Sequence, residues 1–202
     1  MRPANLTPSR LTGTQIDALR QLAGHGSADA VRSLGQLLGA QVEGTTPRAH
    51  VAAKGTIDKV LASSGQGPCF AVHFTVEGGA RMRQLIHLTP DGSTLMAGLL
   101  VGAAVPREAV IYESSLAEAC NIIVSSYLGG VGAAVGVTLV PSVPHLAIGP
   151  LESAIRAAFA EMDEALLLVT DLRLPGVRFA GRIITVPEAE SLSRLLTLLG
   201  VA

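Results

Sequence analysis

A repeat at a shift of 97 residues, the separation of Gly39 and Gly136, constrains the fold of this 202-residue chain more than any other feature of its sequence. The shift superposes Leu19 on Leu116, Gly39 on Gly136, Pro47 on Pro144, Gly79 on Gly176, Arg81 on Arg178, Pro90 on Pro187 and Leu99 on Leu196. Because glycine and proline fix the backbone at turns and helix ends, their shared register predicts two copies of one supersecondary unit. We therefore expect a tandem duplication, with repeats at about 11–102 and 108–199.

Each copy predicts the same succession: a long helix ended by glycine, a short strand, a proline turn, a shorter helix, a hairpin and a last helix. In the first copy we expect these at 12–38, Gln41–Thr45, Pro47, Thr56–Ala62, Cys69–Val76 with Arg81–Leu88, and after Pro90. In the second copy we expect them at 107–135, Val137–Val140, Pro141 and Pro144, Leu151–Ala160, Leu166–Leu172 with Val177–Val186, and after Pro187. Three strands and an apolar hairpin face per copy need a partner surface, so we expect one α+β domain over residues 1–202 with pseudo-two-fold symmetry.

Composition excludes several classes of protein. Hydrophobic residues make up 49% of the chain and charged residues 15%, which is typical of a globular protein with a core and excludes a disordered one. The 15 Lys and Arg against 16 Asp and Glu, without a basic run, lack the electrostatic footprint of nucleic-acid or anionic-membrane binding. Cys69 and Cys120 form no CxxC pair and the N-terminus has no apolar signal segment, so we expect a cytoplasmic protein.

One segment favours the opposite conclusion, a membrane protein. Residues 119–151 contain no Asp, Glu, Lys or Arg, and 122–140 is long and apolar enough to be a transmembrane candidate. In the repeat register this stretch corresponds to 25–43, which carries Asp29, Arg32 and Glu43. We therefore interpret 122–140 as a buried core element and expect no membrane contact, with insertion as the weaker alternative.

A stripe of polar residues lies on the second long helix. Ser114, Glu118, Asn121 and Ser125 follow i, i+4, i+7, i+11 spacing, which places all four on one side of a helix, whereas apolar residues occupy the other side. This pattern predicts an accessible stripe that is available to a partner. The corresponding residues of the first copy are Asp17, Gln21, Gly24 and Ala28.

The pattern Ser114-x3-Glu118-x2-Asn121-x22-Pro144 resembles the signature of the CheC phosphatases of bacterial and archaeal chemotaxis, which CheX and the FliY switch proteins share. The similarity extends to the runs 116–128, 139–145 and 11–22 and to the duplicated architecture, so that it covers almost the whole chain. The resemblance implies two long helices packed on a continuous, mainly antiparallel sheet. It also implies hydrolysis of the aspartyl phosphate of a phosphorylated CheY-type receiver protein.

By this resemblance Asn121 places the attacking water and Glu118 holds the active-site lysine of the receiver, with Ser114 and Pro144 as supporting residues. An acyl phosphate has a good leaving group and the receiver brings its own Mg²⁺, so orienting a water is the remaining task. We therefore expect no cofactor or metal in this chain, whose five histidines show no metal-ligand spacing. Gln21 and Gly24 replace the Glu and Asn of the first copy, beside Asp17, which predicts a degenerate first site and one working centre.

Other interpretations of the same residues remain. Ser115 and Glu118 match a capping box, but the repeat register places the helix start earlier, so that Glu118 lies inside the helix. The glycine run 129–136 fails the dinucleotide fingerprint because Val135 occupies the third glycine position, and its small residues are expected to let two helices approach closely. The main alternative function is a non-catalytic adaptor that docks a receiver or a CheD-type deamidase. Two copies in one chain complete a pseudo-dimer, which favours a monomer.

Overall fold

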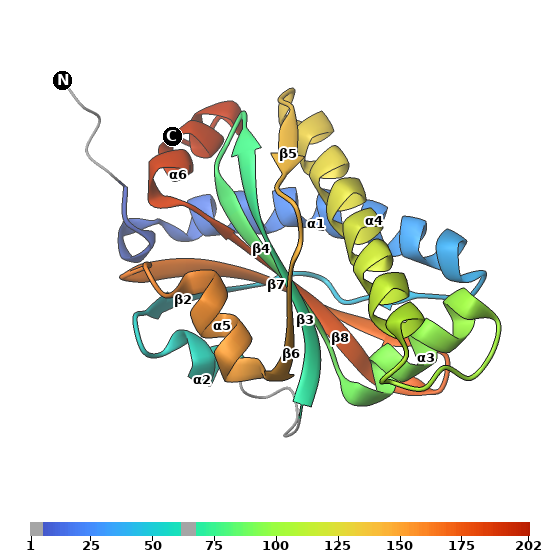
Figure 1. The fold of residues 1–202 in the computed structure, drawn as a ribbon. Coiled ribbons are helices and arrows are strands. Elements are labelled where there is room, and N and C mark those ends of the chain that lie inside the picture. The colour runs from blue at the N-terminus through green and yellow to red at the C-terminus, as the bar shows by residue number, and fades with distance from the viewer. Residues whose placement is uncertain (1–5, 62–67) are drawn as a thin grey trace.

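The structure, a computed structural model, describes residues 6–61 and 68–202 (Figure 1). Its two long helices, α1 (Gly13–Leu38) and α4 (Val110–Val135), have 26 residues each, and both their ends lie 97 residues apart. Each ends at a glycine in the left-handed region, Gly39 with φ 58° and Gly136 with φ 69°. The helix ends predicted from the repeated glycines are confirmed.

The remaining elements also recur at nearly the same shift. In the first half they are β1 (Glu43–Gly44), β2 (Arg48–Ala53), α2 (Ile57–Leu61), β3 (Pro68–Gly78), β4 (Met82–Leu88) and α3 (Pro90–Val101). In the second half they are β5 (Leu139–Pro141), β6 (His145–Pro150), α5 (Leu151–Phe159), β7 (Glu164–Leu174), β8 (Val177–Pro187) and α6 (Ala189–Leu198). A short 3-10 helix, η1 (Pro8–Arg10), precedes α1.

The strands of the described residues form one eight-stranded sheet of order β1-β7-β8-β4-β3-β5, in which β2 also pairs with β7 and β6 with β3. Every pairing is antiparallel. Exchanging the two halves reverses this order and leaves it otherwise unchanged, so the pseudo-two-fold axis passes between the central strands β4 and β8. The predicted α+β fold with a continuous antiparallel sheet is confirmed.

The first two strands of each half pair with the hairpin of the other half. β2 pairs along its whole length with β7, from Arg48 opposite Val169 to Ala53 opposite Glu164. β6 pairs in the same way with β3, from His145 opposite His73 to Pro150 opposite Pro68. The two halves therefore complete each other's part of the sheet.

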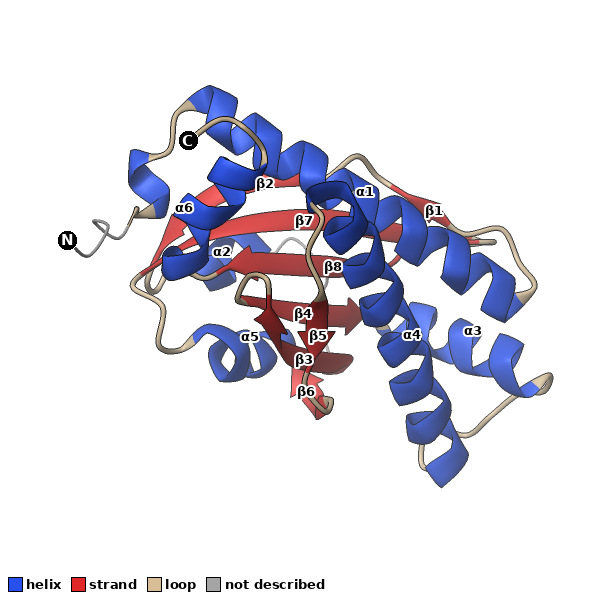
Figure 2. Ribbon diagram, turned by 90° about the horizontal axis from the view of Figure 1, so that it is seen from above, coloured by secondary structure: helices blue, strands red, loops and turns tan. Residues whose placement is uncertain are grey.

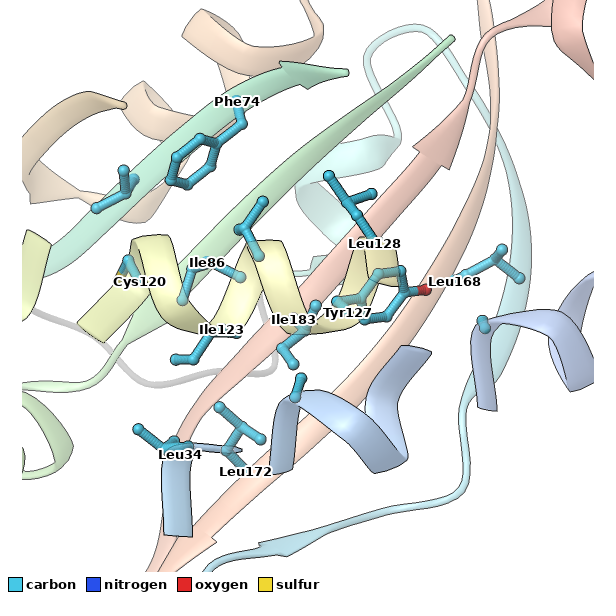
Figure 3. Packing of buried hydrophobic residues seen from close by; sticks show 14 of the residues in the cluster. Leu34, Phe74, Ile86, Cys120, Ile123, Tyr127, Leu128, Leu168, Leu172 and Ile183 are labelled. Carbon is cyan, nitrogen blue, oxygen red and sulfur yellow. The ribbon is translucent and has the colours of Figure 1, made fainter. Parts of the chain in front are cut away.

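Helices cover both faces of the sheet (Figure 2). The helices α1, α3, α4 and α6 share one core cluster with the sheet, and α2 and α5 share the other. Figure 3 shows the first cluster, where Cys120, Ile123 and Tyr127 of α4 lie among side chains from the strands and α1. α4 is long and apolar enough to span a membrane by length and composition, and half of its most apolar window is buried. Packing in the core of the protein therefore explains many of the apolar residues of α4.

The structure corrects several predicted boundaries. The strands β2 and β6 were not predicted, so that each half contributes four strands to the described sheet and not three. β1 is shorter than the expected Gln41–Thr45, and α4 begins three residues later than 107. α2 covers Ile57–Leu61 of the expected Thr56–Ala62, and Ala62 lies outside the described residues. The missed strands lie at the edges of the sheet and lack regular alternation of apolar and polar residues, so the sequence carries no strand signal there.

Candidate functional site

The polar stripe of α4 lies on the surface, as its spacing predicts. Ser114, Glu118 and Ser125 are exposed and Asn121 is half-buried. Cys120, on a different side of the helix, is fully buried. Because α4 begins at Val110, Glu118 lies about two turns inside the helix, which excludes a capping-box role for its carboxylate.

Glu118 and Asn121 present free polar groups to the surface. Their i, i+3 spacing makes them neighbours on one side of the helix, with Cβ atoms about 5–6 Å apart. Within residues 6–61 and 68–202, neither side chain forms a hydrogen bond or an ion pair. Ser114 instead donates its hydroxyl hydrogen to the carbonyl of Ile111 in its own helix, at 3.3 Å. The carboxylate, the amide and the exposed hydroxyl of Ser125, which also forms no hydrogen bond among the described residues, are therefore the groups of this stripe that are free to bind a partner.

The first half shows what its own copy of the stripe faces. Gly24 and Ala28 of α1 line a cavity of about 310 Å³ together with Thr46 and Pro47 of the β1–β2 connection. The repeat register carries these residues onto Asn121, Ser125, Val143 and Pro144. By the pseudo-two-fold symmetry we expect the stripe of α4 to face the β5–β6 connection, where Pro144 directly precedes β6.

The first copy of the stripe lacks the groups that the second copy presents. Asp17 and Gln21 are exposed, and Asp17 accepts a hydrogen bond from Arg20 at 3.1 Å. Gly24 stands where α4 has Asn121, and a Cβ atom built there would meet nothing within 4 Å. The first half therefore has room for an amide at this position but does not carry one.

Two further features lie near the stripe or near Pro144. Burial raises the pKa of Cys120 to about 12, which keeps the thiol beside Asn121 neutral. His145, which follows Pro144, stacks on His73 of β3 with ring centroids 4.8 Å apart. Burial lowers the pKa of His73, and the neighbouring His145 and Arg83 lower it further. This histidine pair depends on the pairing of β6 with β3, for which the sequence carries no signal.

The described residues contain no group of three or more His, Cys, Asp or Glu side chains that could hold a metal ion. Glu118 and Asn121 are too few to form such a centre by themselves.

No protein family model and no curated protein matches the chain, but its fold matches solved structures. FliY of Thermotoga maritima has a TM-score of 0.72 at 17% identity, over 94% of this chain and 98% of that one. FliM of H. pylori, solved as a FliM–SpeE complex, has a TM-score of 0.68 at 13% identity, over 95% and 97%. CheX of Borrelia burgdorferi, solved as a CheX–CheY–BeF3–Mg complex, has a TM-score of 0.55 at 15% identity, over 81% and 96%. The chain therefore has the fold of the CheC, CheX and FliY family.

Proposed function

We propose that this chain hydrolyses the aspartyl phosphate of a CheY-type receiver, with Glu118 and Asn121 as its single working centre. The observation that carries the proposal is the pair itself: an exposed carboxylate and a half-buried amide, side by side on one accessible face of α4 and without partners in the described part of the chain. The helix that holds them is fixed by the buried side chains on its other face. The pair is therefore positioned before a partner arrives.

The chemistry needs little from this chain. A water attacks the phosphorus in line, the bond from phosphorus to the aspartate oxygen breaks, and inorganic phosphate and a free aspartate result. The amide of Asn121 both donates and accepts hydrogen bonds, which suits it to orient that water. The carboxylate of Glu118 is suited to bind the receiver's lysine, and the receiver supplies Mg²⁺. One neutral hydrogen bond contributes about 0.5–1.5 kcal/mol and a charged one about 1.5–3 kcal/mol, which together account for about one to three decades in rate.

A solved neighbour supports a receiver as the partner. CheX of Borrelia burgdorferi has been solved in complex with CheY, BeF3 and Mg²⁺. A protein with this fold thus binds a CheY protein in the presence of Mg²⁺. Under the proposal, this chain does not need to supply that metal ion. The same fold in this chain presents its free carboxylate and amide on α4.

The test is phosphate release from a CheY-type receiver phosphorylated with a small phosphodonor. Asn121→Ala should lower kcat/KM by about 2- to 13-fold, because a methyl group can neither donate to nor accept from the water. The control is Gln21→Ala, which removes the exposed side chain at the Glu118 position of the first half and should leave the rate unchanged. A folded Asn121→Ala protein with full activity would contradict the assignment.

The second candidate is a non-catalytic adaptor. It is favoured by the loss of the Glu and Asn side chains in the first half and by the FliM–SpeE complex, in which a protein of this fold is assembled with a second protein. Under this alternative a receiver or a CheD-type deamidase is bound without turnover. Release of many phosphates per molecule of this chain favours the enzyme, whereas stoichiometric binding alone favours the adaptor. Sedimentation of the isolated chain tests the expected monomer.

A further inference from the structure

Two histidines lie directly opposite each other in the sheet. His73 of β3 pairs with His145, the first residue of β6. Their rings are stacked, with centroids 4.8 Å apart and ring planes at 14° to each other. His145 is exposed and His73 is half-buried, so the pair is accessible from solvent. Because strand pairing brings together residues that are far apart in the chain, spacing along the sequence does not show this pair.

The alternation of side chains along β3 fixes the face on which the pair lies. Val72 and Phe74, which flank His73, belong to the core cluster shared with α4. Successive side chains of a strand point to opposite faces, so His73 points to the other face, where Ala71 belongs to the cluster shared with α5. The histidine pair therefore lies on the α5 face of the sheet, away from the face that α4 covers.

The ring nitrogens of both histidines are free to bind. Within residues 6–61 and 68–202, neither ring forms a hydrogen bond or an ion pair. Burial lowers the pKa of His73, and the neighbouring His145 and Arg83 lower it further, so this ring is neutral at pH 7. A neutral imidazole is the form of histidine that binds metal ions. The ring of His73 therefore offers a nitrogen lone pair for which no side chain of the described residues competes.

The charged residues beside the pair compensate one another. The positive charge of Arg83 on β4 opposes a bound cation, but its guanidinium forms ion pairs with Glu188 at 3.3 Å and with Glu161 at 3.5 Å. It also donates a hydrogen bond to the carbonyl oxygen of Ala158 at 2.9 Å. Two carboxylates against one guanidinium leave this group with a net negative charge. The group as a whole therefore favours a cation nearby.

The first half has no histidine pair at the equivalent place. The counterpart of His145 is Arg48, which is likewise the first residue of its strand. The counterpart of His73 is Thr170. Arg48 donates a hydrogen bond to Asp171 at 2.8 Å and so forms an ion pair there. The fold therefore does not require two imidazoles at this position of the sheet.

We propose that His73 and His145 together bind one divalent transition-metal ion of the class that prefers imidazole nitrogen, namely Zn²⁺, Ni²⁺ or Cu²⁺. Directly opposite residues have Cβ atoms about 4.5–5.5 Å apart, and an imidazole nitrogen lies about 2.0–2.1 Å from a bound Zn²⁺. Two rings that turn their edges toward one ion therefore both reach it. The χ2 angle of histidine is soft, so this turn needs no change in the backbone.

The proposed site is an open one. The described residues contain no group of three or more His, Cys, Asp or Glu side chains that could hold a metal ion, so water fills the other coordination positions. The ion joins β6 to β3 and takes no part in the chemistry proposed for the polar stripe. The site can therefore be tested without a receiver.

The first experiment is titration of the full chain with Cu²⁺–iminodiacetate, followed by electron paramagnetic resonance. Iminodiacetate leaves adjacent positions of the tetragonal ion open, and two imidazoles can fill them. We expect about one bound ion per chain, with nitrogen couplings from both rings. His73→Gln and His145→Gln should each raise the dissociation constant at least about tenfold, because a single imidazole remains.

His50→Gln is the matched control. His50 is also an exposed histidine on a strand, β2, but it lies opposite Leu167 and not opposite a second histidine. Its replacement should leave the dissociation constant for Cu²⁺–iminodiacetate within about twofold of the wild-type value.

The second experiment measures thermal unfolding with Zn²⁺. An ion that binds the folded chain at about 100 times its dissociation constant should raise the unfolding temperature by about 5–10 °C. His145→Gln should remove this shift. Because His145 is exposed, this variant should unfold at the wild-type temperature without metal, and it decides the outcome if His73→Gln does not fold.

Wild-type binding that is equally strong in His145→Gln would overturn the proposed site, and so would nitrogen coupling from a single ring. A wild type that binds neither probe would overturn it as well. None of these measurements involves phosphate release, so the failure of the metal site and the failure of the proposed phosphatase are distinguishable.

Discussion

His87 lies inside the sheet, with 2% of its surface exposed. Its ring centroid lies 6.2 Å from that of Phe179, and the guanidinium carbon of Arg182 lies 4.9 Å from the same Phe179 centroid. Within the part of the chain that the structure describes, its Nδ1 atom has no hydrogen-bond partner. Burial, and then the positive charge of Arg182, lower the pKa of His87 to about 4. This imidazole is therefore neutral in the folded protein at pH 7.

The lowered pKa of His87 makes stability depend on pH. Its folded-state pKa lies below its unfolded value of 6.5, so the unfolded chain binds more protons between these two values. The neutral imidazole of His87 therefore contributes about 3 kcal/mol to the free energy of unfolding above pH 6.5, and this contribution is lost as the pH falls toward 4. The free energy of unfolding, measured with urea at pH 7 and near pH 4, should fall less between these two pH values for His87→Leu than for the wild type. The control is His50→Leu, at an exposed histidine. An equal decrease in the free energy of unfolding in all three proteins would refute the role of His87 in the pH dependence.

At the scale of elements, α1 and α4 touch through glycines. A Cβ atom at Gly26 would lie 2.8 Å from the carbonyl oxygen of Tyr127, and one at Gly130 would lie 2.8 Å from that of His25. The prediction that the glycine run lets two helices approach is confirmed at Gly130. It is wrong for Gly132, which packs against the carbonyl of Val137 in its own half, and for Gly129, which meets nothing within 4 Å.

Neighbouring glycines of α4 give a matched test of this helix contact. Gly130→Ala should destabilise the protein by about 1–3 kcal/mol, because the new methyl group meets a fixed backbone oxygen. Gly129→Ala should stabilise it by up to about 1 kcal/mol, since alanine favours the helix and the site is open. Thermal unfolding of the two variants and the wild type measures both changes in stability. Equal stabilisation by both would mean that the helices are not in close contact.

At the scale of the whole molecule, the duplicated halves exchange strands across the pseudo-two-fold axis. β2 of the first half pairs with β7 of the second, and β6 of the second pairs with β3 of the first. Between them, β4 and β8 join the halves at the centre of the sheet. Each half alone would leave a hairpin strand unpaired on one edge and an apolar face uncovered.

This exchange predicts that neither half folds by itself. Fragments 1–105 and 106–202, produced separately, should show no cooperative thermal unfolding in circular dichroism, because each lacks the strands that complete its sheet. Mixing or coexpressing the fragments should restore a cooperative transition, while the uncut chain provides the reference. A fragment that melts cooperatively as a monomer would show that its half does not need the exchange.

Local chemistry sets several parts of this protein, and these parts can be predicted from the amino-acid sequence. Glycines that permit a left-handed backbone set the ends of α1 and α4, and the turn residues set the two hairpins. Helical spacing placed Glu118 and Asn121 on one side of α4, and their exposure in the structure agrees with that spacing. These features act over a few residues, so they can be recognised without knowing what lies beside them in space.

Other features of the protein depend on residues that are distant in the chain and become visible in the folded structure. β2 and β6 carry no regular pattern and form strands because β7 and β3 offer them backbone hydrogen bonds. The same pairing brings His145 onto His73 and places Leu146 and Ile148 on the α4 face of the sheet. Such contacts join residues far apart in the chain, and their free energy is the sum of packing and pairing over the whole sheet, which no local pattern encodes.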